Sequence, residues 1–139
     1  MATFNRTNQL TEDMGKGVHV FGTHQLKVAL TNTAPTAANA TYAALTAPLA
    51  TTNLSGATPF NVTTTSYTQS AGVASLVLAD LTLTATGAVG PFRYVALYND
   101  TPTSPADPLI GWYDYGSSVT MASSETFLID FAATSITVG

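Results

Sequence analysis

Two histidines, His19 and His24, are the side chains best suited to bind a metal or to act as a base at neutral pH. They lie five residues apart with Gly22 between them, whereas two histidines that share a metal on one helix need a spacing of four. No acid or cysteine directly beside them completes a ligand set. We therefore expect surface or helix-end histidines and no metal site.

Paired carboxylates are the second candidate for chemistry, because glycoside hydrolysis needs two acids about 5–10 Å apart across a cleft. The acids beyond the first twenty residues are far apart in sequence: Asp80, Asp100, Asp107, Asp114, Glu125 and Asp130. Such acids fit turns and strand edges, and only neighbouring strands would bring Asp114 close to Asp130. There is no G-x-S-x-G motif and no histidine after His24 to act as a base. We expect no enzyme activity and no cofactor.

Aromatic side chains with polar tips are the third candidate: Tyr98, Trp112, Tyr113 and Tyr115. Such residues serve as core, as subunit interface or as stacking platforms in carbohydrate grooves, and the sequence leaves these three readings open. Arg93 stands among them in a chain with few charges. We expect it to pair with a specific carboxylate, Asp114 or Asp130, within the fold or across subunits.

Two predicted strands hold these aromatics, over Gly90 to Tyr115, with the proline-rich loop Thr101–Pro108 between them. The first strand is expected to place Phe92, Tyr94, Ala96 and Tyr98 on one face, and Val95 and Leu97 on the other. A strand that is apolar on both faces lies between two layers. We therefore expect it to be a central strand of the core.

The remaining elements are one helix and further strands. Apolar residues at three- or four-residue steps mark a helix from about Asn8 that ends near Gly17. Alternation predicts strands at Leu26–Thr31, Phe60–Thr68, Val73–Thr86 with a bend at Ala79–Asp80, shortly after Tyr115, at Phe127–Phe131 and at Ser135–Val138. Residues 32–58 are expected to be irregular, with a helix at Tyr42–Leu49 as the alternative that Pro48 and the threonines disfavour. This pattern predicts an all-β fold: a single-domain β-sandwich or jelly roll over residues 8–139, with a short N-terminal helix and a polar arm at residues 1–7.

Composition narrows the class of partner. The 139 residues contain no cysteine, only 9% are charged and the net charge is −4. A threonine-rich surface with so little charge suits a chain packed against its own copies or a larger assembly, and it equally suits an ordinary neutral β-domain. The four basic residues are too scattered to form a nucleic-acid patch: Arg6, Lys16, Lys27 and Arg93. No apolar run approaches the 18 residues of a membrane span. The first twenty residues also lack the apolar region of a signal peptide.

Several segments, taken in order, carry a family resemblance: N-Q-L-T-E-D-M-G-K-G-V-H-V-F, L-K-V-A-L-T-N-T-A-P, G-P-F-R-Y-V-A-L-Y-N-D-T, P-L-I-G-W-Y-D-Y-G-S-S-V-T and E-T-F-L-I-D-F. From about Asn5 to Val138 the chain resembles a family of small structural proteins encoded among the virion genes of tailed bacteriophages. The middle, Ala34–Ser70, looks variable. The resemblance implies a virion component without catalytic residues.

Among virion roles, the resemblance best fits a head decoration (cement) protein on the capsid surface. Such proteins are small, all-β and often trimeric, so the implied partners are the major capsid protein and further copies of the chain. The alternatives are a tail or fibre-associated protein, and a carbohydrate-binding module that uses Trp112 with Tyr113 or Tyr115. The expected interface residues lie mainly in the arm, the proline-rich loop and the aromatic strand pair: Phe4, Arg6, Arg93, Asp100, Pro102, Pro105, Trp112 and Tyr113.

Overall fold

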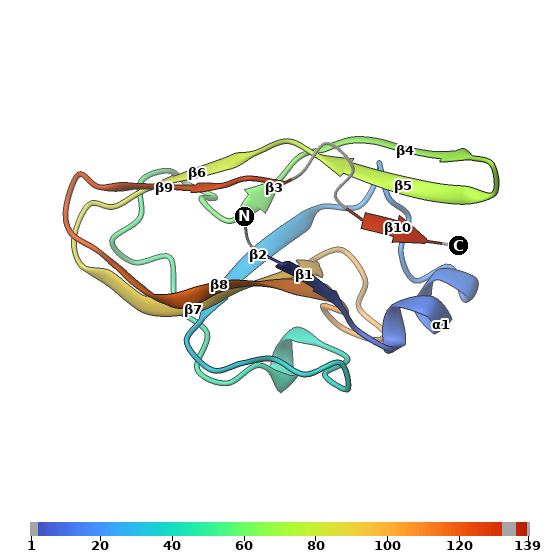
Figure 1. Ribbon diagram of the computed structural model, residues 1–139, viewed down its shortest axis with the longest axis horizontal. Coiled ribbons are helices and arrows are strands. Elements are labelled where there is room, and N and C mark those ends of the chain that lie inside the picture. Colours follow the sequence, from blue (N-terminus) through green and yellow to red (C-terminus); the bar gives the residue numbers. More distant parts are fainter. Residues whose placement is uncertain (1–2, 132–135, 139) are drawn as a thin grey trace.

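A computed structural model describes residues 3–131 and 136–138, and it shows two layers of antiparallel sheet (Figure 1). Strands account for 49% of the chain and helix for 8%, which confirms the all-β class with one short N-terminal helix. One layer is a five-stranded sheet in the order β1 (Thr3–Arg6), β8 (Leu109–Met121), β7 (Val89–Asn99), β2 (Leu26–Thr31) and β3 (Asn61–Val62). The other layer holds the sheet β10 (Ile136–Val138), β5 (Val73–Leu78) and β4 (Thr64–Ser70), with the pair β6 (Leu81–Thr84) and β9 (Thr126–Ile129).

The main core lies between the two layers. Alternate residues of β2, Leu26, Val28 and Leu30, are fully buried there against Leu76 of β5 and Ile129 of β9. Each fully buried leucine or isoleucine contributes roughly 1.5–3 kcal/mol relative to an exposed one. The two-residue period of the sequence therefore becomes one apolar face on each layer.

Strand β7 is central, as predicted, with β8 on one side and β2 on the other. Val95 and Leu97 enter the main core, whereas Ala96 and Tyr98 pack on the outer face of the sheet. The predicted place of Phe92 is wrong, because it joins Val95 in the main core. A register shift between Phe92 and Tyr94 inserts a bulge, and a bulge reverses the face to which the preceding residues point.

Residues 3–7 are not an arm. Strand β1 pairs with β8 in a register that sets Phe4 opposite Tyr113, and the two rings lie 5.0 Å apart. Thr7 is buried, and its hydroxyl donates to the carbonyl of Leu109 at 3.1 Å. The predicted polar arm at residues 1–7 is therefore wrong for the residues that the structure describes, and β1 is an edge strand of the larger sheet.

The N-terminal helix and the bend at Ala79–Asp80 lie where they were predicted. Helix α1 spans Gln9–Gly15, and Leu10 anchors it fully buried in the main core. Asn8 occupies the N-cap position without a side-chain capping bond. Strands β5 and β6 are separated at Ala79–Asp80, where a bend was predicted. Strand β8 continues past Tyr115 to Met121, so the short separate strand predicted there is wrong.

Residues 32–60 form a long excursion, and its first part lies over the outer face of the five-stranded sheet, below that sheet in Figure 1. Further along, Leu54 and Phe60 are buried in the main core. Its only regular element is the 3-10 turn η1 (Tyr42–Ala44), which agrees with the predicted irregular structure. Leu45 is buried against Ala29 of β2 and Ala96 of β7, which makes a second small core outside the sheet. None of the described helices is long and apolar enough to cross a membrane.

Candidate functional site

A row of side chains crosses three neighbouring strands on the outer face of the larger sheet. Tyr98 of β7 is the register partner of Lys27 of β2, and Lys27 is also the partner of Asn61 of β3. Register partners in antiparallel strands carry their side chains on the same face, with Cβ atoms about 5 Å apart. The excursion covers part of this row and leaves a hollow of about 350 Å³, lined also by Tyr42.

The hollow borders the predicted proline-rich loop through an ion pair. Lys27 Nζ lies 3.3 Å from Oδ2 of Asp100, the residue that begins the turn after β7. Burial, and then the nearby charge of Asp100, raise the pKa of Asp107 at the other end of the loop. Burial also raises the pKa of Tyr98, so its hydroxyl stays protonated at neutral pH. Lys27 is thus largely compensated by its own neighbours.

The loop itself is fixed at both ends and exposed at its tip. The amide of Gln25 donates to the hydroxyl of Thr101 at 2.9 Å, and the amide of Tyr42 donates to the carbonyl of Asp107 at 2.9 Å. Pro102 is half-buried and Pro105 is exposed. The loop therefore presents a fixed shape, and its assignment as an interface stays a prediction.

The two central aromatics face opposite sides of the sheet. Trp112 is half-buried beside Ala96 on the outer face, where it packs against the second core. Tyr113 is only 5% exposed and lies in the main core, with its ring 5.0 Å from that of Phe4 and 5.7 Å from that of Phe131. The predicted interface role of Tyr113 is wrong for this fold, and Trp112 and Tyr113 do not form a shared stacking platform.

Arg93 pairs with a carboxylate, as predicted, and the partner is Asp114 within the fold. Arg93 Nε donates to Oδ1 at 2.8 Å and a terminal nitrogen donates to Oδ2 at 3.2 Å. The guanidinium also lies 5.2 Å from the centre of the Tyr94 ring. The hydrogen bond from Arg93 lowers the pKa of Asp114. Arg93 is therefore held against the sheet, and its role across subunits stays a prediction.

Phe4 and Arg6 differ in what they offer a partner. Phe4 is half-buried and packs against the main core, so its main contact is within the chain. Arg6 is exposed on the edge strand β1, as is Asp100 beside Lys27. The interface assignments of Arg6 and Asp100 stay predictions.

A buried polar cluster joins the end of β7 to the segment that follows α1. The side-chain amide of Asn99, which is fully buried, donates to Nδ1 of His19 at 3.1 Å and to Nδ1 of His24 at 2.9 Å. Both rings accept at Nδ1, which places the proton of neutral His19 on Nε2, 3.9 Å from a carboxylate oxygen of buried Asp13. The predicted surface position is wrong for His19.

No local pattern in the sequence predicts this cluster, because Asn99 is 80 residues from His19. The side-chain oxygen of Asn99 also accepts from the amide of Thr101 at 3.2 Å, a turn hydrogen bond that asparagine commonly makes two residues along the chain. Among residues 3–131 and 136–138, no three histidine, cysteine, aspartate or glutamate side chains come together to hold a metal ion. The arrangement locks the N-terminal segment to the sheet.

Stability is expected to fall as the pH drops from about 6.5 toward 4, because of His19. Burial lowers the pKa of His19 to about 4, outweighing the nearby Asp13 carboxylate, while the charge of His24 lowers it slightly further. Between these pH values the unfolded chain binds a proton at this histidine that the folded chain does not bind. The free energy of unfolding therefore falls by up to about 3 kcal/mol by pH 4. Urea unfolding of the wild type and of His19→Gln at pH 7.0 and 4.5 measures this. The variant is expected to lose less stability than the wild type, and equal losses would contradict a buried neutral His19.

Comparisons with known proteins add no relative. A scan against protein-family models, a search of curated proteins and a search of solved structures each found no match to this chain.

Proposed function

We propose that this chain is a structural protein of a tailed-bacteriophage virion that decorates the head, binding the major capsid protein and further copies of itself. The first support is the resemblance described above, which runs from about Asn5 to Val138. The second is the distribution of charge. Between Lys27 and Asp80 the sequence contains no aspartate, glutamate, lysine, arginine or histidine.

The single observation that carries the proposal is the edge strand β4, which lies inside this uncharged run. Among the described residues, β4 pairs with β5 alone, so its other edge is open. Its sequence, T-T-S-Y-T-Q-S, contains neither charge nor proline, the two features that usually prevent edge strands from pairing with another chain. The register shifts between Thr64 and Ser66, so the regular part of this edge is Ser66–Ser70, and that part fits a strand that another chain completes.

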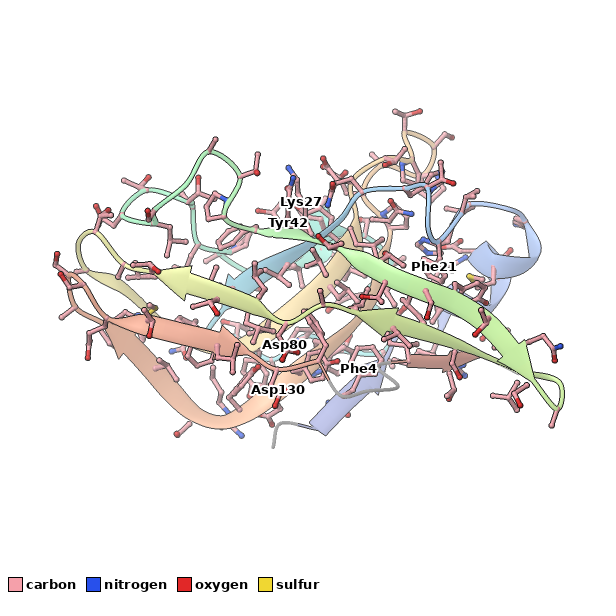
Figure 2. All side chains as sticks on the ribbon, turned by 90° about the horizontal axis from the view of Figure 1, so that it is seen from above. Phe4, Phe21, Lys27, Tyr42, Asp80 and Asp130 are labelled. Carbon is pink, nitrogen blue, oxygen red and sulfur yellow. The ribbon has the colours of Figure 1, made fainter. Side chains whose placement is uncertain are left out.

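The hairpin geometry makes this edge accessible. Ser70 and Val73 are register partners, so Ala71 and Gly72 form a two-residue turn, and both have positive φ, 53° and 82°. Such tight turns match the twist of the strands and keep the hairpin stiff. Figure 2 shows the β4–β5 hairpin running to one end of the molecule, with its turn at the tip. Thr68, Gln69 and Ser70 are exposed there.

In a closed ring of copies, of which a trimer is favoured, β4 of one copy meets a different edge of the next copy. Contacts between unlike surfaces close into rings in this way. The edge strand β1, where Arg6 is exposed, offers such a surface on the other sheet. Each contact with the capsid is individually weak, and several linked copies raise the overall affinity by about 10²–10⁴.

Location in the particle tests the proposal. Virions of the phage that encodes the chain are disrupted, heads and tails are separated on a gradient, and the chain is quantified in each fraction by mass spectrometry. We expect it in the head fraction at a fixed ratio to the major capsid protein. Recovery with tails would support the tail or fibre alternative, and absence from both fractions would refute a virion role.

A further inference from the structure

Strand β9 is a second open edge in the layer that contains β4. Among the described residues β9 pairs with β6 alone, and its sequence, T-F-L-I, contains neither charge nor proline. Strand β6 follows β5 after the bend at Ala79–Asp80, so these two strands form the middle of the layer. Figure 2 shows the green β4 and the orange β9 on opposite sides of that middle. The layer therefore presents an uncharged strand on each side.

Leu128 places an apolar side chain on the outer face of β9. Its neighbour Ile129 is buried in the main core, and successive residues of a strand point to opposite faces, so Leu128 points outward. The side chain of Leu128 is 52% exposed, and its register partner Thr82 is exposed as well. A strand that paired beside β9 would remove part of this apolar surface from water, which is favourable.

The acids that flank β9 restrict what can pair with it. Glu125 precedes the strand and Asp130 follows it, and both are exposed. If β9 paired antiparallel and in register with β9 of a second copy, Glu125 of each copy would lie opposite Asp130 of the other. Like charges directly opposite each other are destabilising. An uncharged strand meets no such repulsion, so β9 favours a neutral partner over its own counterpart.

Strand β4 is a neutral strand of matching length. Its regular part, Ser66–Ser70, has five residues, and β9 has four. Tyr67 packs against the main core, so Thr68 and its alternate neighbours point to the outer face. Pairing of β4 with β9 would therefore set small hydroxyl side chains beside Leu128 and bring no charge close to the flanking acids.

We propose that β9 of one copy receives β4 of the next copy, so that the layers that hold these strands join into one continuous sheet. The proposal rests on the proposed function, because it names the surface that completes β4 in the ring. Strands β4 and β9 are unlike surfaces on opposite sides of one layer, as a closed ring requires. The edge strand β1 fits less well because it contains Arg6, a charge of the kind that blocks strand pairing.

Disulfide trapping between single-cysteine variants tests the pairing, because the natural chain contains no cysteine. Ser66→Cys, Thr68→Cys and Ser70→Cys are each mixed with Leu128→Cys, oxidised and separated on non-reducing gels. Thr11→Cys, exposed on α1, replaces the β4 variant in the control mixture. A disulfide needs Cα atoms about 4.4–6.8 Å apart, so at least one β4 mixture is expected to give the mixed dimer in at least about fivefold higher yield than the control.

Leu128→Thr measures what the apolar side chain contributes. Threonine is favourable in strands and removes most of the apolar surface. The association constant in sedimentation velocity is therefore expected to fall at least about fivefold. Val20→Thr is the matched control, because Val20 is 46% exposed and lies outside both β4 and β9. This variant is expected to associate as the wild type does.

Two results would overturn the pairing of β4 with β9 and leave self-association through β4 intact. One is cross-linking of the β4 cysteines to each other, or to Arg6→Cys of β1, in place of Leu128→Cys. The other is wild-type association of Leu128→Thr. A wild-type chain that sediments as a monomer would instead overturn self-association through β4, and this proposal with it. The location of the chain in the virion is measured independently of both.

Discussion

Replacing Gly111 with alanine is expected to lower the free energy of unfolding by about 3 kcal/mol, at the upper end of the usual cost of overpacking. Gly111 lies in β8 opposite Arg6 of β1. A Cβ atom at this position would overlap the carbonyl oxygen of Asn5 and the ring of Phe4. Because the first of these is backbone, relief requires β1 to move away from β8. Urea unfolding followed by tryptophan fluorescence gives the size of the effect.

Gly15→Ala is the matched control for this substitution. Gly15 is the last residue of α1, and a Cβ atom there would meet nothing within 4 Å. Alanine favours helix over glycine, so this variant is expected to gain up to about 1 kcal/mol. Wild-type stability in Gly111→Ala would show that residues 3–6 are not seated on β8, and would restore the polar arm that the sequence first suggested.

Thr68→Lys is expected to disrupt self-association, with an association constant at least about tenfold lower, which is about 1.4 kcal/mol. Thr68 is exposed on the open edge strand β4. A lysine on such an edge must lose hydration when another strand pairs beside it, and natural proteins use the same device to block pairing. Sedimentation velocity over a concentration series measures the change: the wild type is expected as an oligomer and the variant mainly as a monomer.

Thr11→Lys controls for the added charge. Thr11 is exposed on α1 and lies outside β4, and lysine is a good helix former. This variant changes the net charge by the same amount, so it is expected to associate as the wild type does. A monomeric wild type, or equal association of the two lysine variants, would contradict self-association through β4.

Local periodicity was enough to predict most of the strands. The alternation of Leu26, Val28 and Leu30 predicts a strand with one buried face, and these three residues are fully buried in the fold. The two-sided apolar pattern around Val95 likewise located the central strand. The scarcity of charges indicated that Arg93 pairs with Asp114 or Asp130, and the fold shows that the partner is Asp114. These features depend on neighbours in sequence or on rare residue types.

The strand register and the contacts between segments distant in sequence could not be predicted from the sequence. The polar residues around Phe4 suggested an arm, because nothing local shows that β1 fits over Gly111 of a strand more than a hundred residues later. The bulge before Tyr94 reversed the face of Phe92 for the same reason. The hollow was not predicted because part of its lining belongs to the irregular excursion, which no sequence pattern places over the sheet.

The most direct test of the virion proposal is cryo-EM of heads that lack this protein, incubated with the purified chain. We expect density at every equivalent point of the capsid lattice, saturating with concentration, with each copy joined to its neighbour along β4. Heads without added density, while the same preparation binds isolated tails, would contradict the head assignment and move the protein to the tail.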